Sequence, residues 1–263
     1  MTKDKTAFFE TVNVQRYRAG EWRVVEDDVL IERPVSLIYN GMPHVVIMCT
    51  PQDLIDFIYG FSLTEGIVMS RDDIRSIDIH PKPLGIEARV EVTPLCMSRI
   101  EGRKRQMSAR TGCGICGLDT LTDVVREQKP IDFDFKISEI AIDKALGDAM
   151  DTQVMNQKTG GAHAAFFVAS DGVIILMRED VGRHVALDKL IGAMIQQNID
   201  PKTGFILTTS RASFEMIQKA VAARVGLLVT MSAPTSMAID LAREMNLKLA
   251  AFSRVGKINL YQG

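Results

Sequence analysis

Two cysteines separated by two residues, Cys113 and Cys116, are the strongest candidates for chemistry in this sequence. They lie in the segment 111–117, TGCGICG, in which three glycines flank or separate them. Glycine permits backbone conformations, including positive φ, that other residues avoid, so we expect an accessible loop here rather than packed core. Thiols on such a loop can reach a second molecule. The segment therefore predicts sulfur chemistry.

The residues around this loop favour the thiolate form of the two cysteines. Apolar residues at helical spacing predict a helix over 118–128, whose N-terminus would follow the loop directly. Basic side chains and a helix N-terminus both lower a cysteine pKa, and the thiolate is the reactive form. Five basic residues lie upstream of the loop, against the single acid Glu101: Arg99, Arg103, Lys104, Arg105 and Arg110.

Four kinds of chemistry use a pair of cysteines at this spacing. A structural zinc site needs four ligands, so His163, His184 or a second subunit would have to supply the other two. A thioredoxin-like redox pair lies near a βαβ pattern, which begins here only downstream of the cysteines. A zinc nucleobase deaminase needs an H-x-E motif, and none of the four histidines has one. A persulfide relay needs an exposed, mobile cysteine with a lowered pKa, and the composition of the loop favours it.

The second half of the chain alternates between strands and helices. Such alternation predicts a mostly parallel sheet covered by helices, whereas the first half is β-rich with one main helix after Pro51 and a hairpin at Asn40-Gly41. We therefore expect a β-rich domain at 1–132 and an α/β domain at 133–263. In the second domain, strands are predicted at 164–169, 173–177, 204–209, 227–231 and 248–252, and helices at 138–155, 185–197, 214–223 and 236–244.

Arginines follow several of these strands. Arg178, Arg211 and Arg254 each lie where a strand ends, and ligands of open α/β sheets bind at the carboxyl ends of the strands. Arginines beside helix N-termini suit phosphate or pyrophosphate. Each arginine alone is equally compatible with an ordinary loop, but their number favours an anion site.

Two further segments concentrate ionisable residues. His163 follows the pair Gly160-Gly161 at the start of a strand, where a ligand could approach closely. The segment 178–184, REDVGRH, holds five ionisable residues before a helix, and its Asp180 could be the N-cap. His184 is in line with Leu187 and Ile191, which is typical of a half-buried histidine, and Lys189 is expected on the surface.

Composition limits the partners of the chain. It has 263 residues, 46% of them hydrophobic, and a net charge of -2, so no overall field favours nucleic acid or a membrane surface. The first ten residues do not resemble a signal peptide, and no apolar run approaches the roughly 18 residues of a membrane span. We expect a cytoplasmic protein, where thiols stay reduced. Cys49, in an apolar run, is expected in the core.

Taken together, several segments resemble the FdhD/NarQ family of formate dehydrogenase accessory sulfurtransferases. Each is weak alone, but their order and combination are specific. The resemblance extends from Thr111 nearly to the C-terminus, and it is carried by 111–117 (TGCGICG), 159–165 (TGGAHAA), 179–189 (EDVGRHVALDK), 210–213 (SRAS) and 232–235 (SAPT).

The resemblance implies a sulfur carrier with a cytidine deaminase-like, three-layer α/β domain and a smaller N-terminal domain. Cys113 would bear a persulfide received from a cysteine desulfurase, and Cys116 would assist. The sulfur would pass to the molybdenum or tungsten bis-guanine-dinucleotide pterin cofactor, bound as a substrate, for formate dehydrogenase. The resemblance implies a homodimer. It implies no permanent cofactor and no metal ligand. The residues expected at the cofactor are Phe252, Ser253, Arg254, Val255, Gly256, Lys257, His163, Arg178, Arg183, His184 and Arg211.

The leading alternative is a non-catalytic chaperone for the same cofactor. In that case the two cysteines would hold a structural zinc between subunits rather than carry sulfur. The two functions differ in metal content and in their dependence on a sulfur donor.

Overall fold

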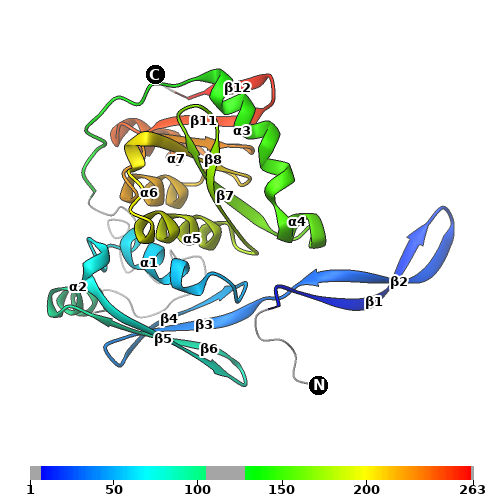
Figure 1. Ribbon diagram of the computed structural model, residues 1–263, viewed down its shortest axis with the longest axis horizontal. Helices are drawn as coiled ribbons and strands as arrows, with labels where there is room; N and C mark the ends of the chain where they lie inside the picture. Colours follow the sequence, from blue (N-terminus) through cyan, green and yellow to red (C-terminus); the bar gives the residue numbers. More distant parts are fainter. Residues whose placement is uncertain (1–6, 105–127, 262–263) are drawn as a thin grey trace.

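The computed structural model describes residues 7–104 and 128–261. Figure 1 shows two main parts, a β-rich N-terminal part and a larger C-terminal α/β part, with helices α1 (Leu54–Thr64) and α5 (Arg183–Gln196) between them. Cys113, Cys116 and most of the predicted helix 118–128 lie outside the described residues. Within the described ranges, no helix is long and apolar enough to cross a membrane. The predicted domain boundary after residue 132 stays a prediction.

A long antiparallel hairpin begins the described chain. Its strands β1 (Phe9–Arg18) and β2 (Glu21–Leu30) pair over ten residues, from Phe9 with Leu30 to Arg18 with Glu21. The turn residues Ala19 and Gly20 both have positive φ, as a type I′ hairpin turn requires. Figure 1 shows this hairpin projecting away from both parts of the molecule.

The N-terminal part is a four-stranded sheet covered by helix α1. The hairpin predicted at Asn40-Gly41 is confirmed, with both residues at positive φ. The apolar face of the four-stranded sheet packs against α1 around Leu37, Phe57 and Val90. The basic segment begins with a helix that we did not predict, α2 (Pro94–Lys104). The sheet order is β4-β3-β6-β5, formed by β3 (Arg33–Tyr39), β4 (Met42–Cys49), β5 (Ile74–Lys82) and β6 (Gly85–Val92), with the short helix η1 (Arg71–Asp73) before β5.

The C-terminal sheet has six strands in the order β12-β11-β10-β9-β7-β8. Only the pairs β9–β10 and β10–β11 are parallel, so the prediction of a mostly parallel sheet is wrong. The reason is that β9 pairs with β7, so the hairpin strand β7 lies reversed between β8 and β9. The strands are β7 (His163–Ala169), β8 (Ile174–Asp180), β9 (Gly204–Thr208), β10 (Leu227–Thr230), β11 (Lys248–Arg254) and β12 (Lys257–Leu260).

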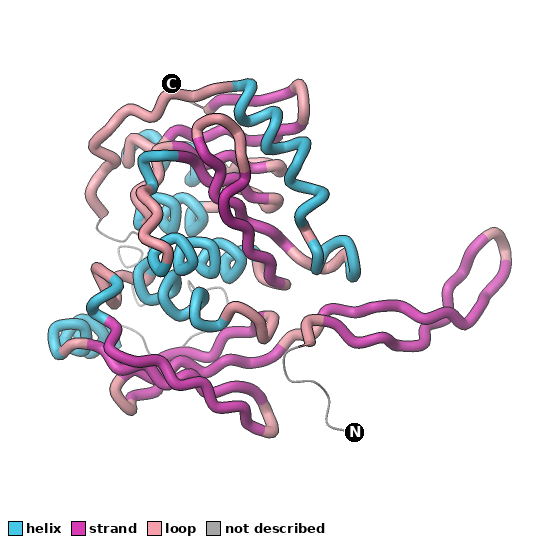
Figure 2. Tube along the Cα trace, viewed as in Figure 1, coloured by secondary structure: helices cyan, strands magenta, loops and turns pink. Residues whose placement is uncertain are grey.

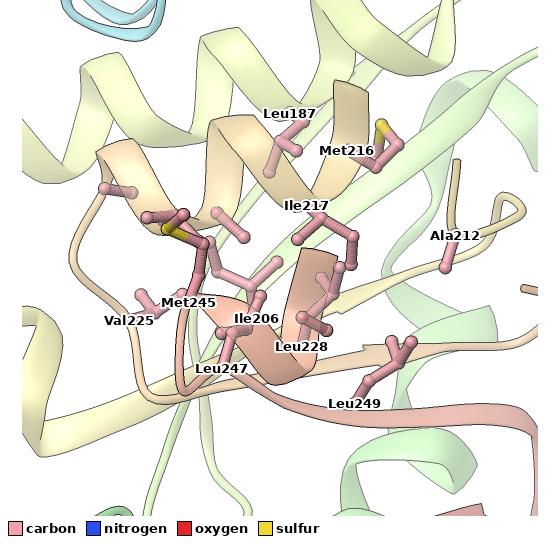
Figure 3. Packing of buried hydrophobic residues seen from close by; sticks show 14 of the residues in the cluster. Leu187, Ile206, Ala212, Met216, Ile217, Val225, Leu228, Met245, Leu247 and Leu249 are labelled. Atoms are coloured by element: carbon pink, nitrogen blue, oxygen red, sulfur yellow. The ribbon is translucent and has the colours of Figure 1, made fainter. Parts of the chain in front are cut away.

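Helices cover both faces of this sheet, which confirms a three-layer α/β arrangement (Figure 2). One face packs on α3 (Glu139–Thr152), which is followed by the short α4 (Val154–Thr159). The other face packs on α5, α6 (Phe214–Ala222) and α7 (Ser236–Glu244), and Figure 3 shows part of that core. Successive strand residues point to opposite faces, so Phe166 packs toward α3 and Phe167 toward α5. A short helix, η3 (Pro201–Thr203), precedes β9.

Candidate functional site

The carboxyl ends of β8, β9, β10 and β11 share one edge of the C-terminal sheet, as the sequence led us to expect. Because β7 is reversed, its first residue, His163, also lies at this edge and pairs with Asp180. The loops after the strands bond to one another: Ala212 pairs with Pro234, and the Phe252 amide donates to the Ser232 carbonyl at 3.1 Å. Segments that are far apart in the sequence therefore meet here, and we define this edge as the candidate site.

His163 is a half-buried imidazole within this site. Burial lowers its pKa below the usual value, and the positive charge of Arg183, together with His184 and Arg211, lowers it further. The neutral imidazole is therefore favoured near neutral pH. A neutral ring beside two arginines can accept or donate one hydrogen bond while the arginines supply the positive charge.

The protein is expected to lose stability as the pH falls from about 7.5 to about 5.5, and replacing His163 with glutamine should make this loss smaller. The folded pKa of His163 is depressed, so below the unfolded pKa the unfolded chain binds more protons than the folded one. Stability contributed by the neutral ring is present above that pH and is lost as the pH falls. Urea unfolding at the two pH values measures the difference, with the exposed His80→Gln as a control for loss of one histidine. Equal pH dependence in wild type and His163→Gln would contradict the assignment.

His184 is positioned by an acid rather than left free for a ligand. Its Nε2 lies 3.0 Å from Glu215 Oε2, and the Ser213 hydroxyl donates to the same oxygen at 3.1 Å. Burial raises the pKa of Glu215, but the hydrogen bond and charge of His184 outweigh it and leave this pKa below its usual value. The predicted half-buried, satisfied histidine is what the structure has, and the array Ser213–Glu215–His184 joins α6 to the start of α5.

Three buried polar atoms near this edge have no hydrogen-bond partner within the described residues: Arg183 Nε, Thr208 Oγ1 and Ser253 Oγ. Buried polar groups are usually paired, so these unpaired ones are candidates to bind a ligand. Arg211 lies exposed in the loop after β9. Two arginines and two hydroxyls are the donors that a phosphate oxygen accepts from.

Phe252 has an unusual backbone at the same edge. Its φ is +53°, and the register of β11 against β12 shifts between Ala251 and Arg254. Positive φ is strained for a non-glycine residue and is concentrated at functional sites. The ring is 47% exposed, so an aromatic face is available for a planar ligand. Ser253, next in the chain, is buried.

Several other residues predicted at the cofactor have hydrogen-bond partners within the protein, and their role at the cofactor stays a prediction. Arg178 Nε donates to Asp56 Oδ2 of α1 at 2.6 Å, so this arginine joins the two parts of the molecule. Arg254 Nη1 donates to the carbonyls of Met231 and Ser253. Val255 and Gly256 form the exposed turn before Lys257, the first residue of β12, and the Gly256 amide donates to Asp143 of α3. Arg178 therefore connects β8 to α1, and Arg254 connects the ends of β10 and β11 at the edge of the sheet.

The remaining acids of the segment 178–184 are structural. Glu179 accepts from the amides of Met155 and Asn156 and so caps the N-terminus of α4. The N-cap of α5 is Gly182 rather than the predicted Asp180, which instead accepts from the Gly182 amide at 2.8 Å. The reason is that Asp180 is the last residue of β8, two residues before the N-cap, and its other oxygen is held by Thr50 and Lys189.

Sequence reasoning missed two buried ion pairs beside the site. Lys189, expected on the surface, is fully buried and lies 2.7 Å from Asp180. Lys219 lies 2.8 Å from both oxygens of Asp188 and also bonds to Thr64. The sequence contained one signal for the first pair: Asp180 lies just before the predicted helix that contains Lys189. Both pairs join the N-terminal part to α5.

The other two cysteines are core residues. Cys49 and Cys96 are free and fully buried, which confirms the expectation for Cys49. Burial raises the pKa of the Cys49 thiol to about 12, and the charge of Asp180 contributes to the shift. Neither is suited to nucleophilic chemistry. In the described part of the chain, no three metal-ligating side chains come together.

Comparison with known proteins shows which family this chain belongs to. A family model described as the FdhD/NarQ family matches residues 30–263. The "Sulfur carrier protein FdhD" of Bordetella petrii is 43% identical over 235 residues, covering 89% of this chain and 84% of that protein. The protein of the same name from Cupriavidus necator is 42% identical over 251 residues, covering 95% and 87%. A crystal structure of a putative formate dehydrogenase accessory protein from Desulfotalea psychrophila superposes with a TM-score of 0.76 at 21% identity, covers 98% of both chains, and supports the fold.

Proposed function

The chain belongs to the FdhD/NarQ family, and on that premise we propose that it is a sulfur carrier for formate dehydrogenase. It accepts persulfide sulfur from a cysteine desulfurase on Cys113. It transfers this sulfur to the molybdenum or tungsten bis-guanine-dinucleotide pterin cofactor, which it binds as a substrate. The names of its relatives, a sulfur carrier and a formate dehydrogenase accessory protein, support the coarser role.

The observation that carries the proposal is the segment TGCGICG at 111–117, which lies within the range matched by the family model. Cys49 and Cys96 are buried, so Cys113 and Cys116 are the cysteines left for sulfur transfer. A deaminase is disfavoured because no histidine is part of an H-x-E motif.

The proposed chemistry balances without an external oxidant. The Cys113 thiolate attacks the outer sulfur of the desulfurase persulfide, the donor S–S bond breaks, and the donor leaves as a thiolate. Cys116 then attacks Cys113 Sγ and expels hydrosulfide, which becomes the sulfur ligand of the metal. The two electrons come from the cysteine pair, which ends as a disulfide. A cellular dithiol reductant restores both thiols.

The candidate site suits the anionic dinucleotide part of this substrate. Arg183 and Arg211 supply positive charge, and the exposed ring of Phe252 can stack on a base. Ser253 and Thr208 supply hydroxyls that have no hydrogen-bond partner among the residues the structure describes. His163 lies among them as a neutral imidazole. These residues bind and orient; the sulfur chemistry belongs to the cysteines.

Intact-protein mass spectrometry after incubation with a cysteine desulfurase and cysteine tests the relay. Wild type is expected to gain mass in steps of one sulfur, and reduction should remove it. Cys113→Ala should gain none, because the acceptor is missing. Cys116→Ala should gain sulfur and keep it longer, because the thiol that releases it is missing.

The double variant Cys113→Ala/Cys116→Ala is the matched control, because it keeps the buried Cys49 and Cys96. Sulfur on the double variant would show that the wrong cysteines were assigned. No sulfur on wild type that instead contains stoichiometric zinc would support the chaperone function and exclude the relay.

Activation of formate dehydrogenase provides the second readout. In cells that lack their own sulfur carrier of this family, Cys113→Ala is expected to leave formate dehydrogenase activity at background. Full activation by Cys113→Ala would exclude the persulfide mechanism. We further propose that the protein acts as a homodimer.

A further inference from the structure

The projecting hairpin of β1 and β2, which we call the arm, has no use in the site described above. At about 3.4 Å per residue its ten-residue strands extend roughly 34 Å. Its base is attached to α4, where Lys158 lies 2.8 Å from Asp28. Its outer end extends beyond the rest of the molecule (Figure 1). An isolated two-stranded hairpin is only marginally stable in water, so a further strand would stabilise it.

The outer end of the arm exposes large apolar side chains. Tyr17 and Trp22 form a cross-strand pair with ring centroids 5.3 Å apart, and they remain 59% and 65% exposed. Val24, on the same face, is 70% exposed. Exposed aromatic residues gathered at one point of a surface are typical of interfaces.

Charge is distributed unevenly along the arm. The outer half, residues 15–24, has three arginines against one glutamate. The inner half, residues 9–14 and 25–30, has four acids and no basic residue. Two arms laid side by side in opposite directions therefore place the positive end of each against the negative end of the other. This arrangement has two-fold symmetry and makes the arm complementary to a second copy of itself.

The free edge of β1 is better suited to such pairing than that of β2. Residues 11–15 of β1, TVNVQ, carry no charge, whereas β2 has three consecutive acids at 26–28 and packs near α4 at its base. Charged side chains are the usual protection of an edge strand against pairing. Within the described residues, β1 pairs with β2 alone.

We propose that β1 pairs antiparallel with β1 of a second copy around a two-fold axis near Val14, which joins two arms into one four-stranded sheet. In that register, Glu10 lies opposite Arg18 of the partner subunit, and the reciprocal pair forms by symmetry. This assignment gives the homodimer of the proposed function its interface and does not depend on the sulfur chemistry.

Charge swaps test the register by sedimentation velocity. Arg18→Glu and Glu10→Arg each create like-charge pairs at two symmetric positions, so each is expected to weaken dimerisation by about tenfold or more. The double variant Glu10→Arg/Arg18→Glu restores opposite charges across the interface and should recover dimerisation. Arg23→Glu reverses a charge at the same end of the arm but on β2, and it should leave dimerisation unchanged.

Sedimentation of wild type at several protein concentrations follows the same event. The sedimentation coefficient is expected to rise with protein concentration in wild type and to stay at the monomer value in Arg18→Glu. If Arg18→Glu and Glu10→Arg both still dimerise, the proposed interface is wrong, although the protein is a dimer. If wild type is a monomer at every concentration, both the interface and the dimer are wrong. A double variant that stays monomeric would overturn the register. None of these outcomes affects sulfur acceptance by Cys113, so failure here is distinct from failure of the proposed function.

Discussion

Replacing Lys189 with methionine is expected to lower the free energy of unfolding by about 3–5 kcal/mol. The Lys189 side chain is 0% exposed, and its Nζ lies 2.7 Å from Asp180 Oδ2 and 2.7 Å from Thr50 Oγ1. Methionine has a similar volume, so little packing is lost. The cost arises because the Asp180 carboxylate stays buried without its counter-ion. Urea unfolding at neutral pH measures it.

Two variants separate the effect of charge from the effect of shape. Adding Asp180→Asn to Lys189→Met removes the uncompensated charge, so the double variant should be more stable than the single one. Lys257→Met removes an exposed lysine and should change stability by no more than about 0.5 kcal/mol. If the double variant were less stable than Lys189→Met, the buried charge would not be the cause.

The position of this ion pair also connects stability to the candidate site. Asp180 ends β8, Thr50 follows β4, and Lys189 lies on α5, so the pair joins the two parts of the molecule. The second oxygen of Asp180 accepts from the Gly182 amide, directly before Arg183. Loss of Lys189 is therefore expected to loosen the start of α5, where hydrogen exchange should increase before global unfolding.

Local features of the fold were predictable from the sequence. Helix α7 begins and ends where the apolar spacing placed it, at 236 and 244, because Thr235 caps it and its period is unambiguous. The Asn40-Gly41 turn was equally clear. The position of β7 was not, because pairing of β9 with β7 rather than β8 depends on contacts between whole elements. The path of α2 was missed because its basic composition masked the spacing of Cys96 and Ile100.

The meeting of the strand ends at one edge was also predictable, but the partners of the side chains there were not. The carboxyl ends of β8 to β11 lie at the same edge, as the order of strands and helices in the sequence indicated. The ion pair of Arg178 with Asp56 could not be predicted, because the two residues lie 122 positions apart in the sequence. A single sequence contains no signal for such a pairing. The roles of Cys113 and Cys116 stay predictions, since both lie outside the described residues.

Replacing Gly192 with alanine is expected to destabilise the protein by about 3 kcal/mol or more. Helices α1 and α5 cross at Gly60 and Gly192 with their backbones in contact. A Cβ on Gly192 would lie 1.8 Å from the Asp56 carbonyl oxygen and 2.8 Å from the Gly60 amide nitrogen. Both obstacles are backbone atoms, so no side chain can rotate away. The helices would have to separate, which would disturb the Asp56–Arg178 and Asp180–Lys189 pairs across the same interface.

Gly147→Ala is the matched control, because Gly147 also lies within a helix but a Cβ there meets no atom within 4 Å. Alanine favours a helix over glycine by about 0.5–1 kcal/mol, so this variant should be more stable than wild type. Thermal and urea unfolding measure the change in stability of each variant relative to wild type. The two changes should have opposite signs if α1 and α5 approach so closely that only glycine fits at position 192. If Gly192→Ala also stabilised the protein, the helices would be able to move apart at little cost, and the interface between the two parts would be adaptable rather than fixed.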